Sequence, residues 1–359
     1  MDRRLRIAGI IGALAVSAAI LLSPSQGVPL PEPTTTQEEG SGSVEILATG
    51  LDEPRAIAVG PLAVYVAERD GAIMAVGDDG PAERALITLR AAGRHDAGLV
   101  GLAAHPDPPN GPTLYAYVTY EEGGELWNRV MWIRHDGARA SDVGTVIDSI
   151  PASAFANGGA MAFGPDGMLY VGTGSASGSP GEGGPLAGKI LRLGADGSVP
   201  DDNPVAGSPV YASGFRDPRG IAWGGDGTMI VADAGPTKND EITPVTAGAD
   251  HGWPEEVCAG GSGVGPAACF DPALGIGGIV VYAGGPLGGE GAVMAASLRA
   301  GTVHSVDIGT GEQGTVIGGL GRVRDVAAAP DGSIYAITSN TDSGGFAGDG
   351  DDRLVRVVR

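Results

Sequence analysis

Two arginines, Arg322 and Arg324, stand one residue apart in the segment GRVRD, which ends at Asp325 and leads into a predicted strand. Because successive side chains alternate in extended backbone, both guanidinium groups are expected on the same face. Two cations on one face repel each other unless carboxylates or an anionic ligand meet them. Asp325 can supply only part of that negative charge. The pair therefore predicts a site for an anionic ligand.

Two more arginines lie on predicted loops. Arg216 stands between Phe215 and Asp217 in a turn that leads into an apolar strand, and Arg299 lies in a turn between two predicted strands. Taken alone, Arg216 is either a salt-bridged brace of its loop or an anion clamp. Arg299 taken alone is either an isolated surface arginine or part of an anion site.

An acidic segment follows the first of these turns. It contains Gly235 and Pro236, then Glu241, then a turn that includes His251. Calcium takes oxygen ligands from carboxylates and backbone carbonyls, and this segment offers both. Acidic loop residues are also commonly just solvated, so the segment by itself leaves both interpretations open.

The elements that must position these residues are predicted to be β-hairpins. An apolar strand end, an Asp-Gly turn and a second apolar strand recur over residues 162–171, 222–231 and 328–337, with weaker copies at 58–66 and 103–118. A sixth unit without the Asp-Gly turn fits between 276 and 308, where three strands are expected, and no helical periodicity separates the units. The pattern predicts an all-β fold, a six-bladed β-propeller. Strand 44–48 is expected to complete the blade that ends with 353–358.

Composition agrees with one large β domain. The chain has 359 residues, 42% of them hydrophobic, and 64 are Gly without a triplet period, which favours many short strands and turns. The net charge of −21 makes nucleic acid an unsuitable partner, because binding phosphates requires clustered Lys and Arg.

The N-terminus is typical of an export signal, because three arginines precede an apolar run over residues 7–22 and small polar residues follow it. We expect a signal peptide or an uncleaved N-terminal anchor in 1–27, a disordered tether rich in Pro, Thr, Gly and Ser in 28–42, and the propeller in 43–359. The protein would then be secreted or held in the cell envelope, touching a membrane only if the anchor is kept. Cys258 and Cys269 are expected to form a disulfide in an exported protein.

Several segments together resemble the soluble PQQ-dependent sugar dehydrogenases, the glucose/sorbosone and aldose sugar dehydrogenase family. The resemblance runs from about Val44 to Val358 and is carried by DAGLVGLAAHPD (96–107), GKILR (188–192), DGSVPDDNP (196–204), GFRDPRG (214–220), and GP, DEI and HGWP within 235–254. It implies a six-bladed propeller that oxidises an aldose at C1 to the lactone, with PQQ as the cofactor and an external electron acceptor.

The resemblance also implies which residues bind PQQ, a tricarboxylate. The four arginines already singled out would be its ligands, with Arg216 also polarising a quinone carbonyl, and two acidic residues would lie near the cofactor: Arg216, Arg299, Arg322, Arg324, Asp96 and Asp217. For calcium, the carbonyls of Gly235 and Pro236 would hold an ion that bridges to PQQ. Glu241 and the His251 carbonyl would hold a structural ion.

The chain departs from the family at the reacting end of the cofactor. The family's general base is a His, and that position here is Ala156, whose methyl group cannot accept a proton. Loss of a general base typically costs on the order of 10²- to 10⁴-fold in rate. The amide of the G-x-R-N-P turn is replaced by Asp217, and Ser175 stands where an Asp is usual. His95, oriented by the neighbouring Asp96, is a candidate substitute base, or else an exposed loop residue without a role.

The missing base leaves two other functions open beside an exported sugar dehydrogenase. One is a catalytically degenerate propeller that binds PQQ, calcium, a sugar or a protein without turnover. The other is a metal-dependent propeller lactonase, for which Asp96, Asn157 and Asp217 would have to converge in the channel.

Overall fold

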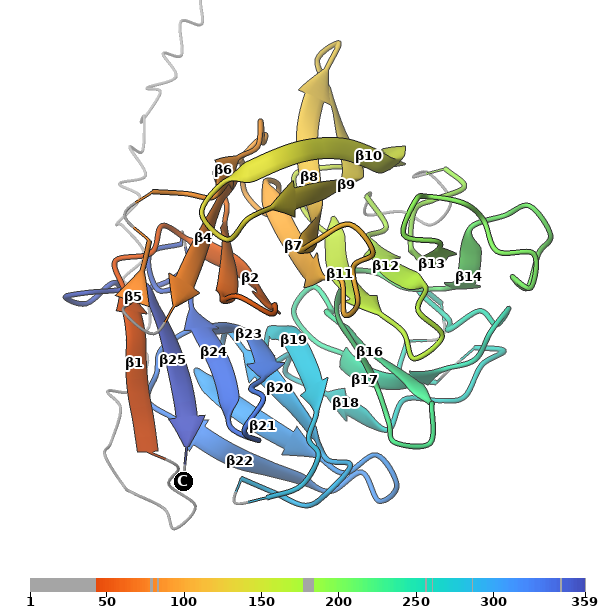
Figure 1. Ribbon diagram of the computed structural model, residues 1–359. Helices are drawn as coiled ribbons and strands as arrows, with labels where there is room; N and C mark the ends of the chain where they lie inside the picture. The colour runs from red at the N-terminus through yellow and green to blue at the C-terminus, as the bar shows by residue number, and fades with distance from the viewer. Residues whose placement is uncertain are drawn as a thin grey trace, which may run out of the picture. The chain divides into compact units, whose positions relative to one another are not determined.

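The computed structural model describes residues 43–77, 80–82, 84–176, 184–255, 257–259, 261–285, 287–342 and 344–358, all within the compact unit Gln37–Arg359. These residues form 25 strands in six sheets and no helix. The sheets surround a central channel, which makes the domain the expected six-bladed β-propeller (Figure 1). The expected signal peptide and tether lie outside the described residues. Nothing in the described ranges forms an apolar helix long enough to cross a membrane.

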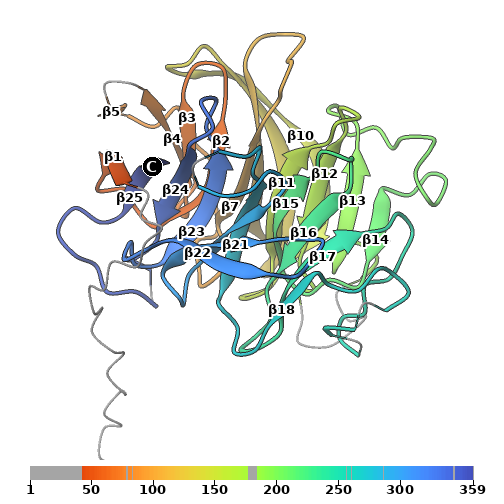
Figure 2. The same ribbon diagram turned by 90° about the horizontal axis from the view of Figure 1, so that it is seen from below.

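Each blade is an antiparallel sheet that begins at the channel and runs outward (Figure 1), and Figure 2 shows the same sheets from below. The strands, from the inner to the outer edge, are as follows. Blade 1 has β2 (Pro54–Val59), β3 (Val64–Glu68), β4 (Ala72–Gly77), and the short β5 (Gly80–Pro81) and β6 (Ile87–Thr88), which both pair with β4. Blade 2 has β7 (Leu99–Ala104), β8 (Thr113–Glu122), β9 (Glu125–His135) and β10 (Ala140–Pro151). Blade 3 has β11 (Gly158–Phe163), β12 (Leu169–Thr173), β13 (Lys189–Leu193) and β14 (Val210–Ser213).

The second half of the ring follows the same order. Blade 4 has β15 (Pro218–Trp223), β16 (Met229–Asp233), β17 (Asp240–Val245) and β18 (Ala268–Phe270). Blade 5 has β19 (Ile276–Val281), β20 (Val293–Ser297), β21 (Thr302–Val306) and β22 (Gln313–Gly318). Blade 6 has β23 (Val323–Ala328), β24 (Ile334–Thr338), β25 (Arg353–Val358) and, at its outer edge, β1 (Ser43–Thr49).

Strands from the two ends of the propeller domain close the ring. β1 pairs antiparallel with β25, with Ser43 opposite Val358 and Thr49 opposite Arg353. The expectation that strand 44–48 completes the last blade is therefore confirmed. The fourth strand of blade 5, β22, was not expected, because its first three residues are exposed and carry no alternating apolar pattern.

The three Asp-Gly turns share one hydrogen-bond arrangement. In the turn between β11 and β12, Gly164 N donates to Met168 O, and Asp166 Oδ1 accepts from Met168 N. The turns before Thr228 and Ser333 repeat this arrangement with Asp226 and Asp331. The Gly after each Asp has a positive φ, 76° at Gly167, which a side chain would disfavour. These turns fix the register of three inner hairpins.

The hydrophobic core lies between the blades. The buried apolar residues of the described ranges fall into six clusters, and each cluster joins two neighbouring blades. The cluster between blades 6 and 1, for example, packs Ile337 and Leu354 against Ile57 and Val66. Burial of apolar surface at every blade interface thus holds the inner strands at fixed positions around the channel.

Each inner strand has a β-bulge or a similar register shift near its first residues. The residues left out of the pairing are Arg55, Val100, Gly159-Ala160, Arg219, Gly277-Gly278 and Arg324. A bulge bends the strand and redirects its side chain. Three blades therefore present an arginine at the same level of the channel, and the other three present small or aliphatic residues there.

Candidate functional site

A pocket of about 340 Å³ opens at the end of the channel where the inner strands begin. Loops of all six blades line it. It contains every residue that the resemblance assigned to PQQ, together with the substitute base and the Gly-Pro pair: Asp96, Arg216, Asp217, Arg299, Arg322, Arg324, His95, Gly235 and Pro236. Residues spread over more than 200 positions of sequence thus meet at one site, as the propeller prediction requires.

The pocket is rich in positive charge although the chain as a whole is strongly acidic. Six arginines and three aspartates line it, whereas the net charge of the chain is −21. Three of these charged residues, Arg55, Arg219 and Asp342, were not foreseen from the sequence. An excess of cations concentrated in one concave site favours an anionic ligand.

Asp342 holds both arginines of the GRVRD segment. Its carboxylate lies 3.0 Å from Arg322 Nε and accepts a hydrogen bond of 3.0 Å from Arg324 Nη2. The two guanidinium groups therefore do share a face, as alternation predicts. Asp325 points elsewhere, and its carboxylate accepts hydrogen bonds of 2.8 Å from the backbone N–H groups of Ile57 and Val326. Burial raises the pKa of Asp325 to about 7.

The carboxylates near Arg55 and Arg324 do not fully offset the cost of burying these two guanidinium groups. Burial, followed by repulsion from Arg55 and Arg219, lowers the pKa of Arg324 to about 9. Burial also lowers the pKa of Arg55. Within the described ranges, the Nε atoms of Arg55 and Arg324 are buried without a hydrogen-bond partner. Anionic oxygens at this end of the channel would satisfy both.

The environment of Asp96 differs from the expectation that it orients His95. Its carboxylate lies 3.7 Å from Arg55 and 3.4 Å from Arg219, and these arginines offset the burial that would otherwise raise the pKa of Asp96. The ring of His95 instead packs against Phe155, with 5.1 Å between ring centroids. In this structure the Asp96 carboxylate contacts arginines and the His95 ring contacts Phe155, so orientation of His95 by Asp96 stays a prediction.

The two loop arginines, Arg216 and Arg299, donate hydrogen bonds to carbonyl oxygens of one short backbone segment. Arg216 Nη1 donates to Ala234 O at 2.7 Å, and Arg299 Nη2 donates to Pro236 O at 3.0 Å. Arg216 also stacks over Trp253, with its guanidinium carbon 5.7 Å from the ring centroid. Both side chains border the pocket, so Arg216 and Arg299 are loop braces and pocket-lining cations at once.

Glu241 borders a void of about 10 Å³, next to Asp233 and Asn239. Burial raises the pKa of Asp233 to about 7 and also raises the pKa of Glu241, so both carboxylates lack compensating charge. His251 does not border this void; its ring stacks on Phe215. The described residues contain no cluster of three or more His, Cys, Asp or Glu side chains suited to a metal, so backbone oxygens would have to complete any calcium site.

The expected disulfide is confirmed. Cys258 and Cys269 are bonded, with 5.9 Å between their Cα atoms. The backbone N–H of Cys258 also donates to the Glu241 carboxylate. The bridge thus holds the loop that caps this carboxylate.

Ala156, the position of the missing base, is buried and does not line the pocket, although its neighbours Phe155 and Asn157 face the channel. Its φ is 56°, in the left-handed region. The side-chain amide of Asn157 accepts a hydrogen bond from Ser153 N and donates one to Ser153 O. Ser175 donates its backbone N–H to Arg216 O at 2.7 Å, so this position braces the arginine turn.

The lactonase interpretation requires oxygens that are free to bind a metal. Asp96 and Asp217 do meet at the pocket, but both carboxylates are bound by Arg219. The Asn157 amide is used within its own loop. These contacts leave the three residues poorly suited to hold a cation together.

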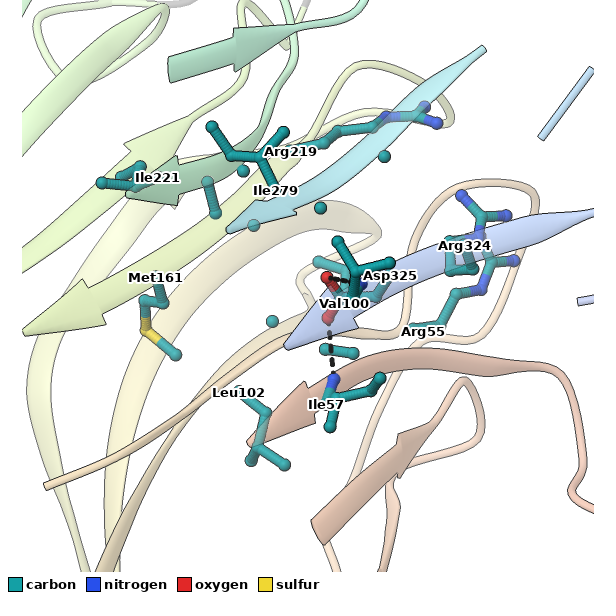
Figure 3. A pocket seen from close by; sticks show the side chains of 18 of the residues that line it. Arg55, Ile57, Val100, Leu102, Met161, Arg219, Ile221, Ile279, Arg324 and Asp325 are labelled. Carbon is teal, nitrogen blue, oxygen red and sulfur yellow. Dashed lines mark hydrogen bonds between the residues drawn. The ribbon is translucent and has the colours of Figure 1, made fainter. Parts of the chain in front are cut away.

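A second cavity of about 270 Å³ continues along the channel. Figure 3 shows Arg55, Arg219 and Arg324 together at one end of it, and Leu102, Met161 and Ile221 away from them. The arginine layer therefore separates the charged mouth of the channel from a more apolar interior.

The fold and this cationic pocket define a six-bladed propeller with an anion site where its inner strands begin. The sequence profile of the Glucose / Sorbosone dehydrogenase family matches residues 51–346, and the chain belongs to this family.

Three proteins that this chain is similar to show how far the relationship extends. Quinoprotein glucose dehydrogenase B of Acinetobacter calcoaceticus is 27% identical over 284 residues, which is 68% of this chain and 59% of that protein. The PQQ-bound structure of aldose sugar dehydrogenase from Streptomyces coelicolor has a TM-score of 0.77 at 31% identity, covering 89% of this chain and 98% of that one. The aldose sugar dehydrogenase YliI of Escherichia coli is 28% identical over 44% of this chain and 46% of its own length. The chain therefore spans less than two thirds of both curated relatives.

Proposed function

We propose that the protein is a PQQ-dependent dehydrogenase that oxidises an aldose at C1 to its lactone. The observation that carries this proposal is the convergence of Arg216, Arg299, Arg322 and Arg324, from three different blades, on one pocket. Membership of the family supports the proposal, as does the similarity to a PQQ-bound aldose sugar dehydrogenase.

The residues present fit a tricarboxylate such as PQQ. The pocket has twice as many arginines as aspartates, six against three. The buried Nε atoms of Arg55 and Arg324 have no hydrogen-bond partner among the described residues. Arg322 and Arg324, oriented by Asp342, would bind one carboxylate group as a pair. Arg216 would polarise a quinone carbonyl, and Arg299 would bind at the exposed rim. When bound, PQQ supplies the orthoquinone that accepts a hydride from the sugar.

The proton of the C1 hydroxyl needs a separate acceptor. We propose His95 for this role, because it lines the same pocket as Arg216 and imidazole is the most frequent general base in enzymes. Its φ of 52° and the packing against Phe155 hold the ring at the mouth of the pocket, where a sugar would enter. Replacing His95 by Gln should lower the rate of sugar oxidation and leave PQQ affinity unchanged.

Calcium is part of the proposal. The carbonyls of Gly235 and Pro236 would serve an ion beside PQQ, and the buried carboxylate of Glu241, together with the His251 carbonyl, would serve a structural ion. Export to the cell envelope or beyond, and transfer of electrons from the reduced cofactor to an external acceptor, complete the proposed function.

A titration of the purified propeller with PQQ, with and without calcium, tests the proposal by calorimetry. We expect binding that is tighter with calcium, followed by dye-linked oxidation of an aldose. Binding without sugar oxidation would instead support a degenerate propeller that holds the cofactor, and absence of binding would refute the cofactor assignment.

A further inference from the structure

Arg219 lies at the bulge of inner strand β15. Its neighbours Pro218 and Gly220 pair with β16, and Arg219 itself does not. Its guanidinium lies at the same end of the channel as those of Arg55 and Arg324 (Figure 3). Arg219 lines both the outer pocket and the inner cavity, so it belongs to the wall that an anionic ligand would meet.

Asp217 is the main carboxylate that Arg219 neutralises. Asp217 is only 2% exposed. Its Oδ2 lies 2.9 Å from Arg219 Nε and 2.7 Å from Arg219 Nη2. Burial alone would lower the pKa of Arg219, but Asp217 and then Asp96 more than offset this and raise it. A buried carboxylate without a cation is strongly destabilising, so Arg219 is a required partner of Asp217.

The other oxygen of Asp217 fixes a neighbouring loop. Asp217 Oδ1 accepts a hydrogen bond of 2.9 Å from Gly158 N, two residues after Ala156. The backbone N–H of Asp217 donates to Asp233 Oδ1 at 2.6 Å. Asp217 therefore connects the arginine turn of blade 4 with the loop that enters blade 3.

We propose that Arg219 is a further cofactor-positioning residue and that it works as a unit with Asp217. The pair has no net charge, like the amide that the resemblance leads one to expect at position 217. Without Arg219, Asp217 would lose its closest cation and keep only Arg216 at 4.0 Å, and Asp96 would keep Arg55 at 3.7 Å, so both carboxylates would repel an anionic ligand more strongly. With Arg219 between them, 3.4 Å from Asp96, the inner wall stays cationic. This inference rests on the proposed function, because it takes PQQ as the ligand.

Four variants test the pair by calorimetric titration with PQQ and calcium at one ionic strength. Arg219→Gln should weaken PQQ binding by about tenfold or more, because it leaves a buried carboxylate unpaired beside an anion. Arg219→Lys, which keeps the charge, should recover much of that affinity. Asp217→Asn should not weaken binding, because Asn still accepts from Gly158 N and removes a negative charge. The double variant Asp217→Asn, Arg219→Gln should bind within about threefold of the wild type, the signature of two coupled residues.

Arg356 offers a matched control, because it is a surface arginine paired with Glu45, 3.6 Å away, outside the pocket. Arg356→Gln should bind PQQ like the wild type. Wild-type affinity in Arg219→Gln would overturn the inference, and so would a double variant weaker than either single one. A wild-type protein that binds no PQQ would overturn the proposed function instead, before any variant is compared.

Discussion

The guanidinium group of Arg299 donates a hydrogen bond of 3.0 Å to the carbonyl oxygen of Pro236. The family resemblance gives these two residues different partners, a PQQ carboxylate for Arg299 and calcium for Pro236. A carbonyl oxygen that already binds one cation is a poor ligand for a second one nearby, because the two positive charges repel. At the proposed calcium site, the ion and Arg299 would therefore compete for this oxygen, and binding of the ion would free the arginine to reach the cofactor.

Removal of this arginine should separate the two roles. We expect Arg299→Gln to bind calcium more tightly than the wild type in the absence of PQQ, by about tenfold, because the carbonyl is freed and a positive charge is lost. PQQ affinity of the same variant should fall. Calcium titration by calorimetry measures the first effect, with Arg134→Gln as a control at an exposed arginine. Equal calcium affinity in variant and wild type would mean that Pro236 is not a ligand.

Restoring the base at position 156 should raise activity. Ala156 has a φ of 56°, which His and Asn adopt more readily than most residues do. We expect Ala156→His to oxidise sugar faster by about 10²-fold or more, the usual contribution of a general base. Ala156→Asn is the matched control, since it accepts the same backbone conformation but cannot serve as the base.

Dye-linked oxidation at saturating PQQ compares these two variants. A similar gain in both would point to a change in loop conformation rather than to proton transfer. No gain in either, together with no sugar oxidation by the wild type, would favour the binding-protein alternative, provided that PQQ still binds.

The affinity for PQQ should depend on pH through Arg324. Its pKa of about 9 means that the side chain begins to lose its charge above pH 8. An anionic ligand favours the protonated form, so affinity should be nearly constant up to about pH 8 and fall as pH rises through 9. Calorimetry between pH 7 and 10 tests this. In Arg324→Gln, binding should be weaker and the decline near pH 9 should be smaller; an unchanged decline would assign it to another group.

Stability should depend on pH through the buried carboxyl of Asp325. Its pKa is about 7 in the folded protein against an ordinary 3.8, so between these values the folded state holds a proton that the unfolded state releases. The contribution of this group to the free energy of unfolding is therefore greatest at low pH and declines as pH rises from about 4 to 7.

Urea unfolding at several pH values would measure that slope. Asp325→Asn should reduce the slope, even though it also weakens a hydrogen bond to the backbone of Ile57 or Val326. Asp226→Asn, in an exposed turn, is a control that should leave the slope unchanged. An identical slope in Asp325→Asn and the wild type would contradict the assignment.

Much of the fold could be predicted from local signals. The Asp-Gly turns mark three hairpins because the hydrogen bonds of each turn lie within a few residues, and the closing strand is apolar enough to recognise. The strand β22 was not predicted because four of its six residues are exposed, so its sequence does not alternate between apolar and polar residues.

The sequence predicts the site residues that lie in recognisable motifs. It does not predict those that reach the pocket only because a β-bulge redirects them. Arg216, Arg299, Arg322 and Arg324 carry recognisable contexts, and all four line the pocket. Arg55 and Arg219 look like ordinary residues near the start of a strand, and regular alternation does not reveal that a bulge leaves them out of the pairing with the neighbouring strand. Asp342 comes from a loop 18 positions beyond Arg324, with no local signal that links the two.

The hydrogen bond from Ile57 N to Asp325 Oδ2 joins the first blade to the last across 268 positions of sequence. Arg55 and Arg324 flank this contact, so two of the three arginines at this end of the channel come from near the start and near the end of the domain. A nascent chain that stops before Arg324 therefore lacks part of the pocket wall. Uptake of the proposed cofactor would therefore follow synthesis of the whole ring, and a bound cofactor would report that the ring has closed.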